Sequence, residues 1–170
     1  MRLVPLRKKE AGRLKRSFCK DLPGLCSLIE GSKTCYRIES SKFTIYVFEG
    51  IPAAVEFARR EGKLYPTLIA VKLGGIQSTH YCVVDKGAVK HILNGANVMA
   101  PGIIDVSKFS VGDIVAVWGP DRKAPIAVGE AVMSSDEIMS RRRGKAVLNV
   151  HYAGDDVWKL CLEYLRSARK

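Results

Sequence analysis

The second half of this chain alternates short apolar runs with glycine and proline turns, and this spacing limits the folds it can form. Apolar and β-branched residues predict strands at 80–84, 97–100, 113–118, 125–133 and 145–152. The turns between them are marked at Pro101-Gly102, Ser110-Val111-Gly112-Asp113 and Gly119-Pro120-Asp121-Arg122. Two short helices are predicted, at 86–94 and 134–140. Many short strands with few helices predict a small closed or nearly closed β-barrel.

The first half mixes helical and strand patterns, which makes the predicted fold class of the whole chain α+β. Its predicted elements are a helix over 6–20, a hairpin from 33–38 and 42–48, a helix over 50–60 and a strand over 64–71. Residues 74–79, GGIQST, are the best candidate for a domain boundary. The apolar spacing of 155–166 predicts a C-terminal helix that docks on the rest of the chain.

The formal net charge of +11 restricts the partners that the chain can attract. A balance this basic favours phosphate backbones or anionic membrane surfaces. Positions 2–20 contain eight Lys or Arg and one Glu, so much of the charge lies near the N-terminus. Two interpretations of that segment stay open: a solvated helix face and an electrostatic contact surface.

The chain shows no membrane or secretory signal. No apolar run reaches the roughly 20 residues of a membrane span, and no apolar core follows the basic N-terminus. The five cysteines have irregular spacing without C-x-x-C, so neither a zinc site nor a disulfide framework is predicted. Most are expected to be small buried side chains. The predicted compartment is the reducing cytoplasm, where disulfides are rare except in hyperthermophile proteins.

The patterns of common catalytic and cofactor sites are missing. None of the three histidines lies in a metal-ligand motif, and no phosphate-binding glycine loop or nucleophile elbow occurs. His80 and Cys82 lie two apart on a predicted strand, which allows a nucleophile pair but favours a structural one. Asp155 and Asp156 fit the N-terminus of the last helix. The sequence therefore predicts no catalytic residue, metal or cofactor.

Residues 84–103, VDKGAVKHILNGANVMAPGI, combine a helix cap, a glycine in the first helical turn and two lysines. Asp85 can cap the helix that begins near Lys86, and Asn94-Gly95 fits its C-terminus with Gly95 in the left-handed conformation. Gly87 leaves backbone N–H groups uncovered for a phosphate or ribose, and Lys86 and Lys90 add positive charge. The alternative interpretation is an ordinary strand–helix–strand connection with its caps.

This stretch resembles the hallmark of the PUA domain, a small RNA-binding pseudobarrel. The later predicted strands fall where PUA strands are expected, and Val128-Gly129-Glu130-Ala131 resembles the x-G-x-A strand of that family. The resemblance covers roughly 78–155.

Further segments, EGKLYPTL, NVMAPG, NVHY and DDVW, resemble the malignant-T-cell-amplified-sequence family. Members of that family, like the start of ligatin, place a pre-PUA domain before a PUA domain. The resemblance implies a pre-PUA domain over 1–76, a PUA domain over 77–156 and a helical tail over 157–170, in a relative of archaeal type. It also implies a role at the small ribosomal subunit, with a translation-factor partner such as the density-regulated protein of eukaryotes.

The resemblance assigns RNA-binding residues as well. Around the glycine turn and the next strand they are Asp85, Lys86, Gly87, Ala88, Lys90, Asn97, Val98 and Met99. The later strands add Val128, Gly129, Asn149, His151 and Tyr152. By charge alone, Arg141, Arg142 and Arg143 are further predicted phosphate contacts. The alternatives are core burial for Val98, Met99 and Tyr152, and simple solvation for Lys90 and the arginines.

Together these features predict a non-catalytic protein that binds tRNA or rRNA in translation initiation, reinitiation or recycling. Two alternatives stay open: a module that brings RNA to a separate modification enzyme, and an adaptor for a translation factor. An enzyme is least favoured, because no activated nucleophile, metal site or cofactor loop is visible.

Overall fold

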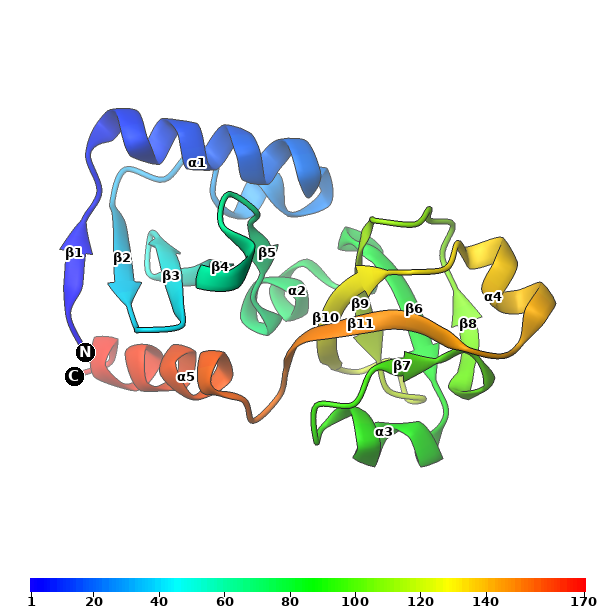
Figure 1. Cartoon of the computed structure of the whole chain (residues 1–170). Coiled ribbons are helices and arrows are strands. Elements are labelled where there is room, and N and C mark those ends of the chain that lie inside the picture. Colours follow the sequence, from blue (N-terminus) through cyan, green and yellow to red (C-terminus); the bar gives the residue numbers. More distant parts are fainter.

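The computed structural model describes residues 1–170 and contains two sheets that lie side by side (Figure 1). The first sheet is antiparallel, in the order β1 (Leu3–Pro5), β2 (Cys35–Glu39), β3 (Phe43–Phe48), β4 (Ile51–Phe57) and β5 (Tyr65–Pro66). Three helices bury residues against it: α1 (Lys8–Asp21), α2 (Leu68–Gly74) and α5 (Asp156–Ala168). The C-terminal helix therefore returns to the sheet formed by the first half of the chain.

The second sheet has the order β7 (Val98–Met99), β11 (Lys145–Tyr152), β10 (Pro125–Ala131), β9 (Ile114–Trp118), β6 (His80–Val84) and β8 (Ile103–Val106). Its edge strands, β7 and β8, are joined by the three-residue turn Ala100–Gly102, so the sheet must curl until its edges come close. Two short helices, α3 (Lys86–Ile92) and α4 (Ser135–Arg141), lie beside it (Figure 1). The predicted α+β class with a β-pseudobarrel is confirmed.

One hydrophobic core joins the two sheets. A cluster of 28 buried residues combines α1, α2, α5 and the first sheet with one face of the second sheet, from which it takes Val83, Ile114, Ala116, Trp118 and Val128. Alternate residues of the same strands face a second cluster of 15 residues inside the pseudobarrel. Strands β6, β9 and β10 are therefore buried on both faces, which explains continuous apolar runs such as IVAVW.

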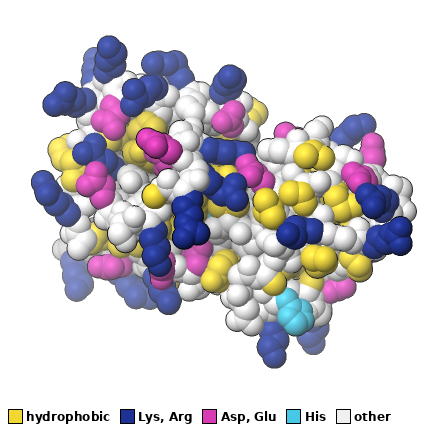
Figure 2. Space-filling view, viewed as in Figure 1, with side chains coloured by type: hydrophobic (Ala, Val, Ile, Leu, Met, Phe, Trp, Pro, Cys, Tyr) yellow, Lys and Arg dark blue, Asp and Glu magenta, His cyan; other side chains and the backbone are white.

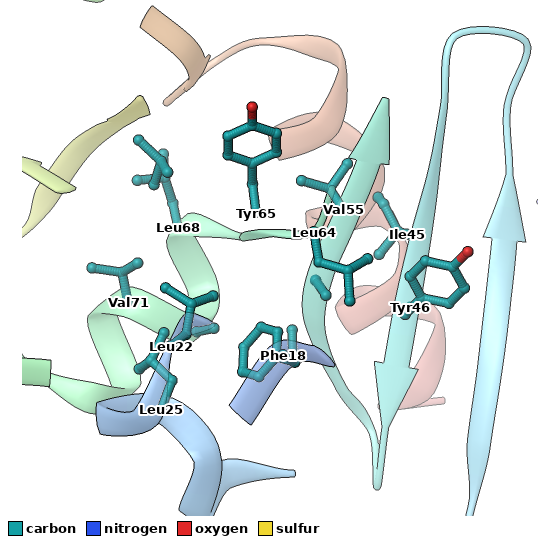
Figure 3. Close-up of a cluster of buried hydrophobic side chains, with 14 of the residues drawn as sticks. Phe18, Leu22, Leu25, Ile45, Tyr46, Val55, Leu64, Tyr65, Leu68 and Val71 are labelled. Carbon is teal, nitrogen blue, oxygen red and sulfur yellow. The ribbon is translucent and has the colours of Figure 1, made fainter. Parts of the chain in front are cut away.

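Figure 3 shows the part of this core where α1 meets the first sheet. Phe18 of α1 and Leu25 of the following turn are fully buried, and they lie near Val71 of α2 (Figure 3). Each large apolar side chain buried in this way contributes about 1.5–3 kcal/mol. The one-sided apolar face of α1 thus fixes the helix on the sheet and leaves its basic residues toward solvent (Figure 2).

A buried hydrogen-bond chain also connects the second sheet with two helices that pack on the first, α2 and α5. His151 of β11 is fully buried, and its Nε2 accepts the backbone N–H of Leu68 at the start of α2 (3.1 Å). Its Nδ1 therefore carries the proton and donates to Asp155 Oδ2 (2.8 Å). Asp155 also accepts the backbone N–H groups of Tyr152 and Trp158 and so caps α5. Burial acts to raise the pKa of Asp155, but these hydrogen bonds outweigh it and lower that pKa.

The prediction of a helix over 50–60 was wrong. Glu49 and Gly50 both have positive φ angles and form a tight turn, so β4 pairs directly with β3. Ala53, Ala54 and Val55 are fully buried in that strand. The modest helical preference of alanine is overridden here by burial and strand pairing.

The strand predicted over 64–71 was mostly wrong. Only Tyr65–Pro66 pair as β5, and α2 begins at Leu68. The Thr67 hydroxyl accepts the N–H of Ala70 and caps this helix, and Gly75 ends it with a φ of 84°. The all-apolar run LIAV is equally typical of a buried strand and of a buried helix, because periodicity does not distinguish them over so few residues.

The expectation of no disulfide was also wrong. Cys19 at the end of α1 is bonded to Cys26 in the 3₁₀ turn Pro23–Leu28. The other three cysteines, Cys35, Cys82 and Cys161, are free and buried, as predicted for most of them. The bonded pair is separated by seven positions, a spacing that no common sequence motif marks.

The remaining predicted elements are present. The basic helix, the hairpin of β2 and β3, the strands near 80, 98, 114, 125 and 145, and the three later helices all form near their predicted bounds. Strands β1 and β8 were not predicted. No helix is long and apolar enough to cross a membrane.

Breaking the disulfide should destabilise the protein. Closing a loop this short restricts the unfolded chain by about 2–3 kcal/mol, so Cys19→Ser/Cys26→Ser should lower the melting temperature by several degrees. Thermal unfolding followed by circular dichroism measures this. Reductant should lower the melting temperature of the wild-type protein but not that of the double variant. Equal melting of the wild-type protein with and without reductant would contradict the assignment.

The Asp155 interaction should make stability depend on acid pH. The pKa of Asp155 in the folded protein lies below the ordinary value of 3.8. Its contribution to the free energy of unfolding is therefore complete above about pH 5 and is lost as pH falls through the lowered folded-state pKa. Asp155→Asn should therefore lower the free energy of unfolding by about 2 kcal/mol at pH 7 and by much less near pH 2.5. Urea unfolding at both pH values measures the difference, and an equal effect at both would refute the pH dependence.

Candidate nucleic-acid interface

The turn between β6 and α3 is built by a side-chain cap. Asp85 Oδ1 accepts the N–H of Ala88 (2.9 Å), and the backbone N–H of Asp85 donates to Gly102 (2.8 Å). The carboxylate of Asp85 therefore already occupies the start of this seven-residue helix. Lys86 and Lys90 are exposed and belong to no ion pair, so the positive charge of this turn comes from their side chains.

Gly87 leaves the surface open at the second position of α3. Its φ is not positive, and an added Cβ would meet only the Asp85 carboxylate, at an ordinary contact distance of 3.5 Å. Neither backbone strain nor internal packing therefore requires glycine at this position. A glycine in a helix costs about 1 kcal/mol relative to alanine, and here it leaves the backbone uncovered toward solvent.

The loop from α3 to β7 is held by Asn149 of β11. Its side-chain Nδ2 donates to the carbonyl oxygens of Ile92 and Ala96 (both 3.0 Å). Its backbone N–H donates to Asn97 Oδ1 (2.9 Å). Both predicted asparagines thus position this loop, and the Asn149 side-chain oxygen is buried without a hydrogen-bond partner.

Several predicted RNA-binding residues have side chains that the fold buries. Val98 is 1% exposed, and Val128 and His151 are fully buried, so the core alternative describes Val98. A Cβ at Gly129 would collide with the backbone oxygen of Leu148, which makes this glycine necessary for pairing β10 with β11. Direct side-chain contact of Val98, Val128 or His151 with RNA is incompatible with this burial.

Other predicted residues lie at or near the surface. Met99 is 49% exposed, whereas Ala88 is half-buried beside Gly102. Tyr152 is half-buried, and its ring lies beside Gly95, whose φ of 92° matches the left-handed conformation predicted at the end of α3. Exposed Met99 presents a flexible apolar side chain beside its basic strand partner, Lys145.

The arginine run follows α4, and its three members have different contacts. Arg141 is paired with Glu137 (2.7 Å), and Arg142 donates to the backbone oxygen of Ile103 (2.8 Å). Arg143 is exposed and unpaired, as is Lys145. Because Lys145 is the strand partner of Met99, these cations border the β7 edge of the sheet.

His80 and Cys82 do not form the nucleophile pair that their spacing allowed. Cys82 is fully buried, and burial raises the pKa of its thiol to about 12. His80 lies at the surface beside Asp113, with 3.6 Å between Nε2 and Oδ2. No group of three or more His, Cys, Asp or Glu side chains is arranged to hold a metal ion.

We define the candidate interface as Lys86, Gly87, Lys90, Met99, Arg143 and Lys145. Figure 2 shows basic side chains over α3 at the lower edge and near α4 at the right, with apolar groups between them. The exposed Leu93, Ile104 and Met139 were not predicted, because an apolar residue in a short element gives no sequence signal of exposure. The basic helix α1 lies along the top of the first half, whereas α3 lies below the second sheet, so α1 forms a separate surface (Figure 1).

Comparison with known proteins agrees with this fold. A family model described as the PUA domain matches residues 80–153. A hypothetical protein from Pyrococcus horikoshii superposes with a TM-score of 0.81 and 29% identity, over 94% of this chain and 99% of that chain. These similarities define a PUA-domain protein.

Sequence relatives specify the family. An uncharacterized protein of Methanocaldococcus jannaschii is 32% identical over 90% of this chain and 93% of its own length. Translation machinery-associated protein 20 of Schizosaccharomyces pombe is 40% identical over 47% of both chains. Malignant T-cell-amplified sequence 1 of Rattus norvegicus is 34% identical over 61% of this chain and 59% of its own length. The chain belongs to the PUA protein family that includes these relatives, although its match spans only about half to six tenths of the eukaryotic ones.

Replacing Gly87 should separate stability from binding. Gly87→Ala should raise the free energy of unfolding by about 0.5–1 kcal/mol, because the Cβ fits and helix propensity improves. Urea unfolding measures this change. If Gly87 serves backbone approach to a ligand, the same variant should lose RNA affinity despite its greater stability. A destabilised variant would contradict the claim that neither backbone strain nor packing requires glycine at position 87.

Proposed function

We propose that the protein is a non-catalytic RNA-binding protein of the translation apparatus, and that its RNA is tRNA or rRNA. The carrying observation is that exposed, unpaired cations border two open features of a PUA domain. Lys86 and Lys90 flank the uncovered Gly87 turn, and Lys145, next to Arg143, is the strand partner of exposed Met99. Lysine and arginine side chains neutralise phosphates, whereas apolar groups contact unpaired bases. No reaction is assigned, since the one candidate nucleophile, Cys82, is buried and protonated.

The names of two relatives support the link to translation. Translation machinery-associated protein 20 occurs in both Schizosaccharomyces pombe and Saccharomyces cerevisiae. Following the family resemblance, we further propose that the protein acts in the cytoplasm, in initiation, reinitiation or recycling at the small ribosomal subunit. A translation factor is the protein partner we propose. The supporting matches cover only part of these relatives, so the role of the whole relative is proposed rather than transferred.

The test is RNA binding across a salt series. Fluorescence anisotropy would compare an intact tRNA, the same tRNA without its single-stranded 3′ end, and small-subunit rRNA. The variant Lys86→Glu/Lys90→Glu is compared with Lys108→Glu/Lys123→Glu, which makes the same charge change at exposed positions outside the candidate interface.

We expect the wild-type protein to bind at least one of these RNAs, with affinity that falls steeply as salt rises. The α3 variant should bind at least tenfold more weakly and with a salt slope lower by about two, whereas the control variant should change little. Binding of a translation factor without any RNA binding would refute the proposal and favour the adaptor alternative. Equal loss in both variants would place the contact outside the candidate interface.

A further inference from the structure

An open cleft of about 720 Å³ lies where the two sheets meet. Its walls come from the β2–β3 turn, the end of β4 with the following 3₁₀ turn, strand β11 and the first turn of α5. The volume lies within the roughly 300–1,000 Å³ of small-ligand sites. None of the residues of the candidate interface lines this cleft.

Three cations converge on it, two from the paired ends of β3 and β4 and one from α5. Lys42, Arg59 and Lys159 line the cleft, are exposed, and take part in no ion pair. Figure 2 shows basic side chains along the junction of the two halves, near its centre. Unpaired like charges that lie close together repel one another, so binding of an anion in the cleft is electrostatically favourable.

The two carboxylates that line the cleft do not cancel this charge, and Glu163 lies beside Lys42 and Lys159 in an adjoining hollow. Asp155 is held by His151 and by two backbone N–H groups. Glu130, which does not line the cleft, pairs with Lys63 and with Arg60 (2.9 Å). Asp156 is the one exposed carboxylate in the lining, and it faces three free cations.

The remaining lining has the character of a base-binding surface. Phe57 is half-exposed at the cleft, while its ring packs edge-on against Phe43 and Tyr65 (centroids 6.2 and 6.0 Å). Tyr152 is half-buried and also lines the cleft. Aromatic rings held in this way can stack on unpaired bases at little cost in side-chain entropy.

The cleft adjoins the loop that follows α3. Tyr152 lines the cleft and also lies beside Gly95, at the end of α3. Asn149 likewise lines the cleft and is bonded to the α3–β7 loop. Strand β11 therefore leads from the α3–β7 loop, next to the candidate interface, into the cleft.

We propose that this cleft binds a single-stranded segment of the RNA held by the candidate interface, an inference that rests on the proposed function. Lys42, Arg59 and Lys159 contact its phosphates, and an unpaired base lies against Phe57 or Tyr152. RNA bound in this way contacts both halves of the protein.

The test uses Lys42→Glu/Lys159→Glu, with Lys108→Glu/Lys123→Glu as the matched charge control. Anisotropy with the tRNA and the small-subunit rRNA described above gives affinity and salt slope. The same RNAs transcribed with 4-thiouridine are then cross-linked to the wild-type protein, and the cross-linked peptides are identified by mass spectrometry. Thermal unfolding verifies that both variants fold.

We expect the cleft variant to bind at least tenfold more weakly, with a salt slope lower by about two, while the control changes little. Cross-links should fall on Phe57 or on residues 149–152. Wild-type binding that depends on Lys86 and Lys90 but not on Lys42 and Lys159, with cross-links elsewhere, would overturn the cleft assignment and leave the proposed function intact. Failure of the wild-type protein to bind either RNA would overturn both.

Discussion

The packing of the second sheet against the first half of the chain is the interaction on which the rest of the structure depends. Val83, Trp118 and Val128 leave one face of the pseudobarrel apolar, and α2 and its neighbours cover that face. Burial of such side chains is worth about 1.5–3 kcal/mol each, which favours a fixed arrangement of the two sheets. The cleft at their junction exists only because this packing sets the distance and angle between them.

Polar contacts make the same junction specific. His151 receives a hydrogen bond from α2 and gives one to Asp155, so one imidazole connects β11 of the second sheet with α2 and with the cap of α5. A buried polar chain of this kind is costly unless every member is paired, and it therefore favours one register of β11. The family resemblance suggested His151 for RNA contact. Its buried side chain instead holds together the elements that carry the proposed RNA surface.

Local sequence signals predicted the structure correctly where they were strong, and the predictions were wrong where tertiary packing overrode those signals. Asp85 and Gly95 have the predicted cap and left-handed conformation, because both depend on chain geometry within a few residues. The prediction of a helix over 50–60 was wrong because pairing with β3 and burial outweigh the helical preference of its alanines. In the candidate site, the charged residues of α3 were predicted to be exposed and are exposed. Burial of Val98 and Val128 could not be decided from apolar character alone.

The sequence by itself determined the fold class, most strand positions, the basic character and the PUA resemblance, since each of these follows from residue type and local spacing. Tertiary structure alone decided which side chains share a surface. Pairing of β3 with β4 brings Lys42 near Arg59, and the return of α5 to the first sheet adds Lys159 from the far end of the sequence to the same cleft. The same holds for the Cys19–Cys26 bond, which forms because the turn after α1 folds back on the helix. The cleft depends on the packing of distant segments and the disulfide on the path of the turn after α1, and no local sequence motif encodes either one.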